Sequence, residues 1–191
     1  AATQAPNVDV NAIVWGGDKF VAAVNDGTIF YSSDGNTWIS ANNGSKIFNI
    51  TAYGVTWNGA KFVAVGRGNI ASDPTIAYSS DGTTWTPVTS SNSIFSTAGY
   101  GVAWSGEKFV AVGSGTNSIA YSVDGENWTP VTSSTNIFTT GRGICGNPKV
   151  GPVDIPSKII IDEGDALEFD YGEYYNNDIT NITMRIKAEE E

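Results

Sequence analysis

The strongest constraint on this chain is an internal repeat of two short phrases. The first phrase occurs as VWGGDKFVAAV, VTWNGAKFVAVG and VAWSGEKFVAVG, and the second as YSSDGNTW, YSSDGTTW and YSVDGENW. The first tryptophan of each copy, at Trp15, Trp57 and Trp104, recurs after 42 and then 47 residues. A period of this length with strand-like residues throughout is typical of one four-stranded antiparallel unit. The repeat therefore predicts an all-β fold in which function resides on loops or surfaces.

Each repeat is expected to form four short strands joined by tight turns. In the second copy, Asn58-Gly59 is a strong hairpin signal, and in the Asp81-Gly82 turn the glycine supplies a positive φ. The strand between them, residues 61–66, is apolar on both faces, which indicates a sheet covered on both sides. The repeated tryptophans are expected to pack in the core. The lysines that open this strand, Lys19, Lys61 and Lys108, are expected to point to solvent.

The three S-x-D-G-x-x-W segments resemble the Asp-box, or BNR, repeat of sialidase-like β-propellers, with one residue fewer between Asp and Gly. The longer pattern is similar to propeller repeats of bacterial surface proteins and phage virion proteins, over roughly residues 12–146. The resemblance implies a β-propeller-like array of three four-stranded antiparallel blades followed by a C-terminal β segment. A β-trefoil, which also has three four-stranded repeats, is the alternative. The residues implied as structural Asp-box turns are Asp34, Gly35, Asp81, Gly82, Asp124 and Gly125.

Three blades cannot close a propeller by themselves. Closure is expected from a degenerate fourth blade within residues 144–191 or from association of several copies. Residues 1–149 are predicted to form the repeat domain, with nine acids against seven bases and a net charge of −2. Residues 150–191 carry eleven acids against three bases, a net charge of −8, and are predicted to be an acidic β segment for closure or assembly.

The composition removes most catalytic chemistries. The chain has no histidine, so the usual general base and metal ligand are missing, together with any Ser–His or Cys–His pair. Arg67, Arg142 and Arg185 do not share a repeat position, so they do not form the arginine triad that a sialidase needs. Each turn aspartate is a single acid, whereas calcium takes six to eight oxygen ligands. We therefore predict no enzymatic activity, no cofactor and no metal site.

The remaining features favour a non-enzymatic structural or binding module of a virion or cell surface, of the phage tail, fibre or capsid accessory type. Its expected partners are other virion or surface proteins, further copies of itself, and glycans. A variable loop in the second copy, with Arg67, Asn69 and Asp73, is the predicted ligand-facing loop. The net charge of −10 disfavours nucleic acid, and no apolar run is long enough for membrane insertion. The alternative is a secreted carbohydrate-binding or glycoside-processing protein.

Overall fold

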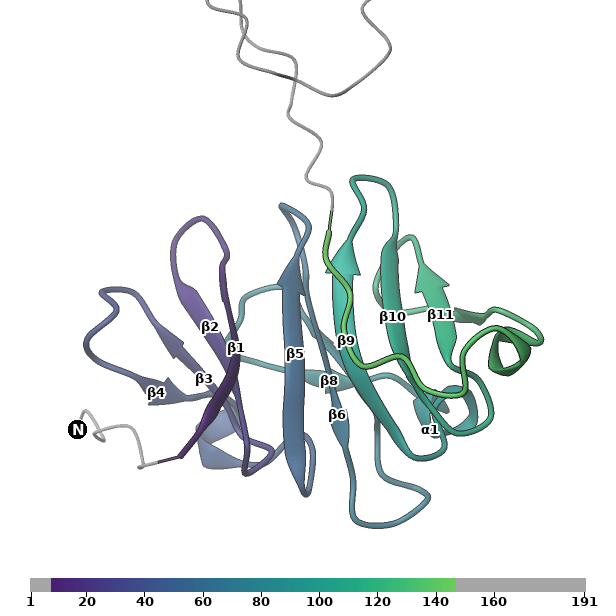
Figure 1. The fold of residues 1–191 in the computed structure, drawn as a ribbon. Helices are drawn as coiled ribbons and strands as arrows, with labels where there is room; N and C mark the ends of the chain where they lie inside the picture. Colours follow the sequence, from purple (N-terminus) through teal and green to yellow (C-terminus); the bar gives the residue numbers. More distant parts are fainter. Residues whose placement is uncertain (1–7, 147–191) are drawn as a thin grey trace, which may run out of the picture. The chain divides into compact units, whose positions relative to one another are not determined.

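The computed structural model describes residues 8–146, which belong to one compact unit. They form three four-stranded sheets, here called blades, one after another along the chain (Figure 1). The first blade consists of β1 (Val10–Trp15), β2 (Phe20–Val24), β3 (Ile29–Ser32) and β4 (Ile39–Ser40). The second consists of β5 (Thr51–Trp57), β6 (Phe62–Arg67), β7 (Ile76–Ser79) and β8 (Thr86–Pro87). The third consists of β9 (Ala98–Trp104), β10 (Phe109–Ser114), β11 (Ile119–Ser122) and β12 (Thr129–Pro130).

Short helical segments follow the last strand of each blade. They are the 3-10 helix η1 (Ala41–Gly44), the single-turn helix α1 (Ser91–Ile94) and the 3-10 helix η2 (Ser134–Asn136). Within residues 8–146, none of the helices has the length and apolar character needed to cross a membrane. The segments serve as links that lead the chain from the outer strand of one blade towards the inner strand of the next.

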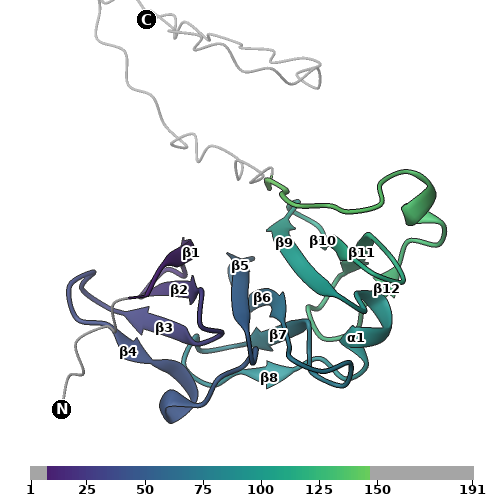
Figure 2. The same ribbon diagram turned by 60° about the horizontal axis from the view of Figure 1, so that its bottom comes forward.

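Every blade is a simple antiparallel meander in which strands adjacent in sequence are adjacent in the sheet. The first strands of the blades, β1, β5 and β9, lie next to one another, and the later strands extend away from them (Figures 1 and 2). This arrangement confirms the predicted β-propeller-like array and not the β-trefoil. The three sheets do not close into a ring.

Local turn chemistry explains the register of the first hairpin in the second blade. The Asn58 side-chain oxygen accepts hydrogen bonds from the N–H groups of Ala60 and Lys61 at 2.9 and 2.7 Å. Gly59 has a φ of +99°, a left-handed conformation that glycine adopts without steric cost. The turn pairs Trp57 with Phe62, whose ring centroids lie 4.1 Å apart. The hairpin predicted from Asn-Gly is confirmed.

The core lies between the blades. Strand β6 is buried on both faces, as its two-sided apolar sequence predicted. One hydrophobic cluster fills the space between the first and second blades, with Val21, Ile29 and Phe62 among its members. A second fills the space between the second and third blades and includes Val63 and Phe109. Because each sheet supplies residues to both neighbours, a blade at the end of the array has one face without such a neighbour.

The predicted boundary near residue 150 and the acidic segment 150–191 lie outside the described residues. The described chain ends just after the point at which the repeat phrase fails. There, residues 141–146 run beside β9 (Figure 1): a Cβ added to Gly101 would lie 3.4 Å from the Gly143 Cα atom. A Cβ atom added to Gly54 of β5 would likewise lie 3.6 Å from the Gly101 Cα atom. Residues 141–146 thus occupy the position of a fourth inner strand.

Candidate functional site

The three Ser-x-Asp-Gly turns have nearly identical geometry. In the first, the Asp34 carboxylate accepts hydrogen bonds from the N–H groups of Asn36 and Thr37 at 2.8 and 2.7 Å. The Ser32 hydroxyl donates to the same carboxylate and accepts from the Gly35 N–H group at 2.9 Å. The tryptophan of the phrase closes the turn, because the Trp38 indole N–H group donates to the Gly35 carbonyl at 3.1 Å. These carboxylates therefore act as turn-closing acceptors.

Hydrogen bonding holds the turn carboxylates in their ionised form. The N–H group of Thr37, then that of Asn36, lowers the pKa of Asp34 to about 2. Burial raises the pKa of Asp81 and Asp124, but hydrogen bonds outweigh that effect, and both pKa values fall well below the usual range. The donors are backbone N–H groups and the neighbouring serine hydroxyl at Asp81, and at Asp124 the Asn127 side chain first, then backbone N–H groups and the serine hydroxyl. A carboxylate whose pKa lies well below its usual range stays ionised at neutral pH and is unsuited to general acid–base catalysis there.

The predicted ligand-facing loop borders a polar hollow of about 190 Å³ in the second blade. Asp73 closes this loop by accepting hydrogen bonds from the N–H groups of Asn69 and Ile70 at 2.6 and 3.1 Å. The side chain of Asn49, then the Ile70 N–H group, lowers the pKa of Asp73. Asp73 is therefore engaged within the loop, while Arg67 and Asn69 are exposed at the hollow.

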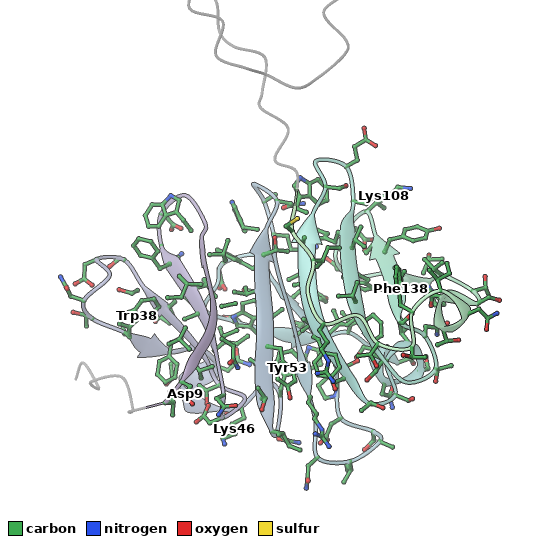
Figure 3. The ribbon with its side chains drawn as sticks, viewed as in Figure 1. Asp9, Trp38, Lys46, Tyr53, Lys108 and Phe138 are labelled. Carbon is green, nitrogen blue, oxygen red and sulfur yellow. The ribbon has the colours of Figure 1, made fainter. Side chains whose placement is uncertain are left out.

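A row of side chains crosses the inner strands at one repeat position. The ring centroids of Tyr53 on β5 and Tyr100 on β9 lie 5.1 Å apart, and the Arg142 guanidinium lies 5.4 Å from the Tyr100 ring centroid. Within residues 8–146, neither phenol hydroxyl and no guanidinium N–H group makes a side-chain hydrogen bond. Figure 3 labels Tyr53 on β5. Two phenol rings tilted by 55° to each other, beside a guanidinium group, can contact a planar or polyhydroxylated ligand.

A pair of apolar residues, Ile-Phe, follows each blade and behaves differently at the end of the array. Phe48 and Phe95, which follow the first and second blades, are both 0% exposed. Their counterpart after the third blade, Phe138, is 56% exposed, and its neighbour Ile137 is 65% exposed (Figure 3). The sequence repeats at these three positions, yet the third pair has no following blade to pack against in the described residues.

The in-register lysines show the same difference. The Lys19 ammonium donates to the Asp81 carbonyl of the second blade at 3.0 Å, and the Lys61 ammonium pairs with Glu126 of the third. The expectation that these lysines point to solvent is therefore wrong for Lys19 and Lys61, because the next blade's turn lies within reach of each ammonium. Lys108 is exposed, and its ammonium lies over the Tyr121 ring at 4.9 Å (Figure 3).

The outward face of the third blade keeps the sequence of an interior face. The residues that pack against the following blade are Val21, Ala23, Ile29 and Tyr31 in the first copy, and Val63, Val65, Ile76 and Tyr78 in the second. The third copy has Val110, Val112, Ile119 and Tyr121 at these positions. Gly141 lies against Val112, but Val110, Ile119 and Tyr121 remain partly exposed. We call Lys108, Val110, Ile119, Ile137 and Phe138 the third-blade face.

Sequence reasoning singled out the turns and the loop but missed both the third-blade face and the row at Tyr53. Sequence differences between the copies of the repeat could have indicated the third-blade face. The first copy reads FVAAV and IFYS where the others read FVAVG and IAYS. These changes place Val24 and Phe30 where later blades have glycine and alanine, and they show that the two ends of the array are not equivalent.

No family model and no curated protein matches the sequence. The fold is similar to that of a GH74 enzyme from Niastella koreensis, a β-propeller-type glycoside hydrolase, with a TM-score of 0.51 and 20% sequence identity. The similarity covers 73% of this chain but only 19% of the enzyme, so the chain spans about a fifth of that protein's length. At this identity the likeness establishes the β-propeller-like fold alone.

Proposed function

We propose that this protein is a non-enzymatic structural module of a virion or cell-surface assembly, joined to a neighbouring protein through its third-blade face. The observation that carries the proposal is the exposure of Ile137 and Phe138, whose counterparts in both earlier repeats are buried. Contiguous exposed apolar side chains of this kind are typical of protein interaction sites. The Asp-box resemblance fits this role, because the turn carboxylates are engaged in hydrogen bonds within the turns.

Exchange of Phe138 for glutamate tests the proposal. A carboxylate at the centre of an apolar contact disrupts binding, because its burial without a partner is costly. We expect the Phe138→Glu protein to keep the melting temperature of the wild type but to be lost from the purified virion or surface structure of its source. The matched control is Ile70→Glu, which changes an equally exposed apolar residue on a loop of the second blade. Full incorporation of the Phe138→Glu protein would contradict the proposal.

Carbohydrate binding is the second candidate function, and the row formed by Tyr53, Tyr100 and Arg142 favours it. Two adjacent phenol rings, tilted by 55° to each other and with hydroxyls free of side-chain partners, offer the apolar surface and polar groups that sugar rings contact. The fold likeness to a glycoside hydrolase is compatible with this function. A glycan array tests it: binding that is lost in Tyr100→Ala would support a carbohydrate module. Cleavage of any glycoside by the wild type, abolished by one acidic-residue exchange, would contradict a non-enzymatic role.

A further inference from the structure

The two internal blade interfaces define what the third-blade face would contact. On the receiving blade, a glycine near the end of the second strand accommodates the phenylalanine that precedes the blade. A Cβ atom added to Gly66 would lie 2.4 Å from the Phe48 ring, and one added to Gly113 would lie 2.7 Å from the Phe95 ring. Such distances are too short for any side chain, so the phenylalanine packs directly on the backbone. The receiving strand therefore needs glycine at the position before its last residue, as in β6 and β10.

The receiving blade also contributes its Ser-x-Asp-Gly turn. Cβ atoms added to Gly82 and Gly125 would lie 3.0 Å from Val21 and 2.9 Å from Val63 of the preceding blade. The same turns accept the lysine of that blade, through the Asp81 carbonyl in one case and Glu126 in the other. The turn thus faces the preceding blade, and its glycine and polar groups form the second half of the contact.

Residues 141–146 leave a specific part of a fourth blade to be supplied. Gly141 lies on Val112, with an added Cβ atom 2.5 Å from the Val112 Cβ atom, as Gly99 lies on Val65 at 2.9 Å. The inner-strand position beside the third blade is therefore already occupied by this chain. The strands that would cover Phe138 and receive Lys108 correspond to β6, β7 and β8 of the second blade, and residues 147–191 contain no copy of their sequence phrase.

Resting on the proposed function, we infer that the third-blade face binds antiparallel β-strands of another protein, which complete a fourth blade. The partner strands carry a glycine at the point that the Phe138 ring contacts and a small residue at the position equivalent to Ala77. They also contain an Asp-Gly turn that accepts a hydrogen bond from the Lys108 ammonium. Successive blades pack face to face through side chains, so the partner strands would contact the third-blade face as the third blade contacts the second. These requirements follow from the two internal interfaces, because the third-blade face has the same residue types as the faces buried there.

A second copy of this chain does not match these requirements. Its first blade is the one that could follow a third blade, but Val24 and Phe30 stand at the positions of the required glycine and small residue. Val24 is 2% exposed and packs with Phe30, Ala22 and Trp38. An apolar hollow of about 90 Å³ on that face is lined by Val24 and Phe30 among others. In both internal interfaces the packing phenylalanine lies on a glycine at the position of Val24, so the valine side chain would clash with the ring of Phe138.

The test uses the full chain and a synthetic peptide of residues 58–90, which carries Gly66, Ala77 and the Asp81-Gly82 turn. The matched control peptide has Gly66→Val and Ala77→Phe, the first-blade residues at those positions. We expect the first peptide to bind and to shift the NMR signals of Phe138. The control peptide, and a Phe138→Ala protein with the first peptide, should each bind at least about tenfold more weakly. Equal binding of both peptides would overturn the inference.

A second measurement tests the inference even if the synthetic peptide does not fold. A photo-reactive phenylalanine analogue replaces Phe138 in the native assembly, and the linked residue is identified by mass spectrometry. A link to a strand of another protein with glycine at the position before its last residue supports the inference. A link to a second copy, a link to a helix, or no link overturns it. If Phe138→Glu loses assembly but the two peptides bind equally well, the proposed function stands and the inferred β-strand partner is wrong. If the first peptide binds more tightly than the control but Phe138→Glu still assembles, the β-strand contact stands and the proposed function is wrong.

Discussion

The first and third blades come from the same repeat, but their outward faces are built differently. On the first blade, Val24 and Phe30 replace the glycine and alanine of the later copies and are buried against Trp38 and Val8. On the third blade, Val110, Ile119 and Phe138 retain the residue types that the two earlier copies bury between blades. Larger side chains therefore fill the first face from within the blade, while within residues 8–146 the third face is covered at Val112 by Gly141 and is otherwise partly exposed.

This difference indicates that the array has a direction. Terminal repeats of repeat proteins are commonly altered so that their outer face does not need a neighbour. The first blade shows such an alteration at the two positions that would clash with a preceding blade, although Ile13 and Val10 stay exposed at its rim. The third blade shows no such alteration on its outer face, where Val110, Ile119 and Phe138 keep the residue types of the earlier copies. In the function that we propose, the first end therefore acts as a cap and the third-blade face acts as the interface.

The largest expected effect separates Phe95 from Phe138. Phe95→Ala removes a fully buried ring between two blades, and such a change costs about 3–5 kcal/mol of unfolding free energy. Phe138→Ala removes an exposed ring and should change the stability of the isolated protein by less than about 0.5 kcal/mol. Urea unfolding of both variants measures the difference. Equal losses would mean that Phe138 already packs in an interface within the isolated chain.

Exchange of glycine for valine sharpens the comparison at the second strand. Gly113→Val introduces the first-blade residue type where Phe95 lies against the backbone, so overpacking should cost about 1–3 kcal/mol. The control is Gly143→Val, because no atom lies within 4 Å of a Cβ added there. Thermal unfolding should show a clear drop for Gly113→Val only. A stable Gly113→Val protein would show that Val24 does not mark the first blade as a cap.

The turn aspartates should produce acid sensitivity at both ends of the array. Asp124→Ala removes a carboxylate that accepts two backbone N–H bonds, which should cost about 0.5–2 kcal/mol at pH 7, as loss of a capping side chain does. The folded-state pKa is depressed, so this stabilisation is complete above the ordinary value of 3.8 and is lost as pH falls through the folded value. For Asp34 that window extends from 3.8 to about 2.

Urea unfolding between pH 7 and pH 2 measures this effect in the wild type and in Asp124→Ala. The stability difference between the two proteins should shrink below pH 4. A difference that stays constant down to pH 2 would show that the aspartate contributes by packing and not by its charge.

The smallest expected effect concerns the lysines. Lys61→Met removes a partly exposed ion pair with Glu126 but keeps the apolar stem, and it should cost about 0.2–1 kcal/mol. Lys108→Met removes the contact of the ammonium with the Tyr121 ring but no ion pair with a following blade, so it should cost less than Lys61→Met. Salt should reduce the Lys61 difference, since exposed charges are screened. Thermal unfolding at low and high ionic strength checks this, and a larger loss for Lys108→Met would contradict an open third-blade face.

The blade architecture could be predicted from the sequence because its determinants are local. Asn58-Gly59 and the Ser-x-Asp-Gly phrases fix the turns through hydrogen bonds that span three residues or fewer. Strands that are apolar on both sides indicate a sheet buried on both faces. The inter-blade contacts were harder to predict. Lys19 and Asp81 are 62 residues apart, and nothing near Lys19 in the sequence indicates the carbonyl that it reaches.

The third-blade face escaped prediction for a different reason. The sequence around Phe138 repeats that around Phe48 and Phe95, so its pattern indicates a buried residue at all three positions. Burial depends on the following blade, and the repeat phrase fails only after residue 138. The loop at Asp73 was predicted as ligand-facing from its length and polarity, whereas its carboxylate is engaged by the N–H groups of the loop itself.

Hydroxyl-radical footprinting tests the difference between the two ends most directly. The isolated protein and the protein within the virion or surface assembly that we propose for it are labelled in parallel, and oxidation is measured at Phe138 and at Trp15, which is 48% exposed near the first end. We predict that assembly protects Phe138 and Ile137 and leaves Trp15 and Ile13 as reactive as in the isolated protein. Protection at the first blade with an unchanged Phe138 would contradict the assignment of cap and interface.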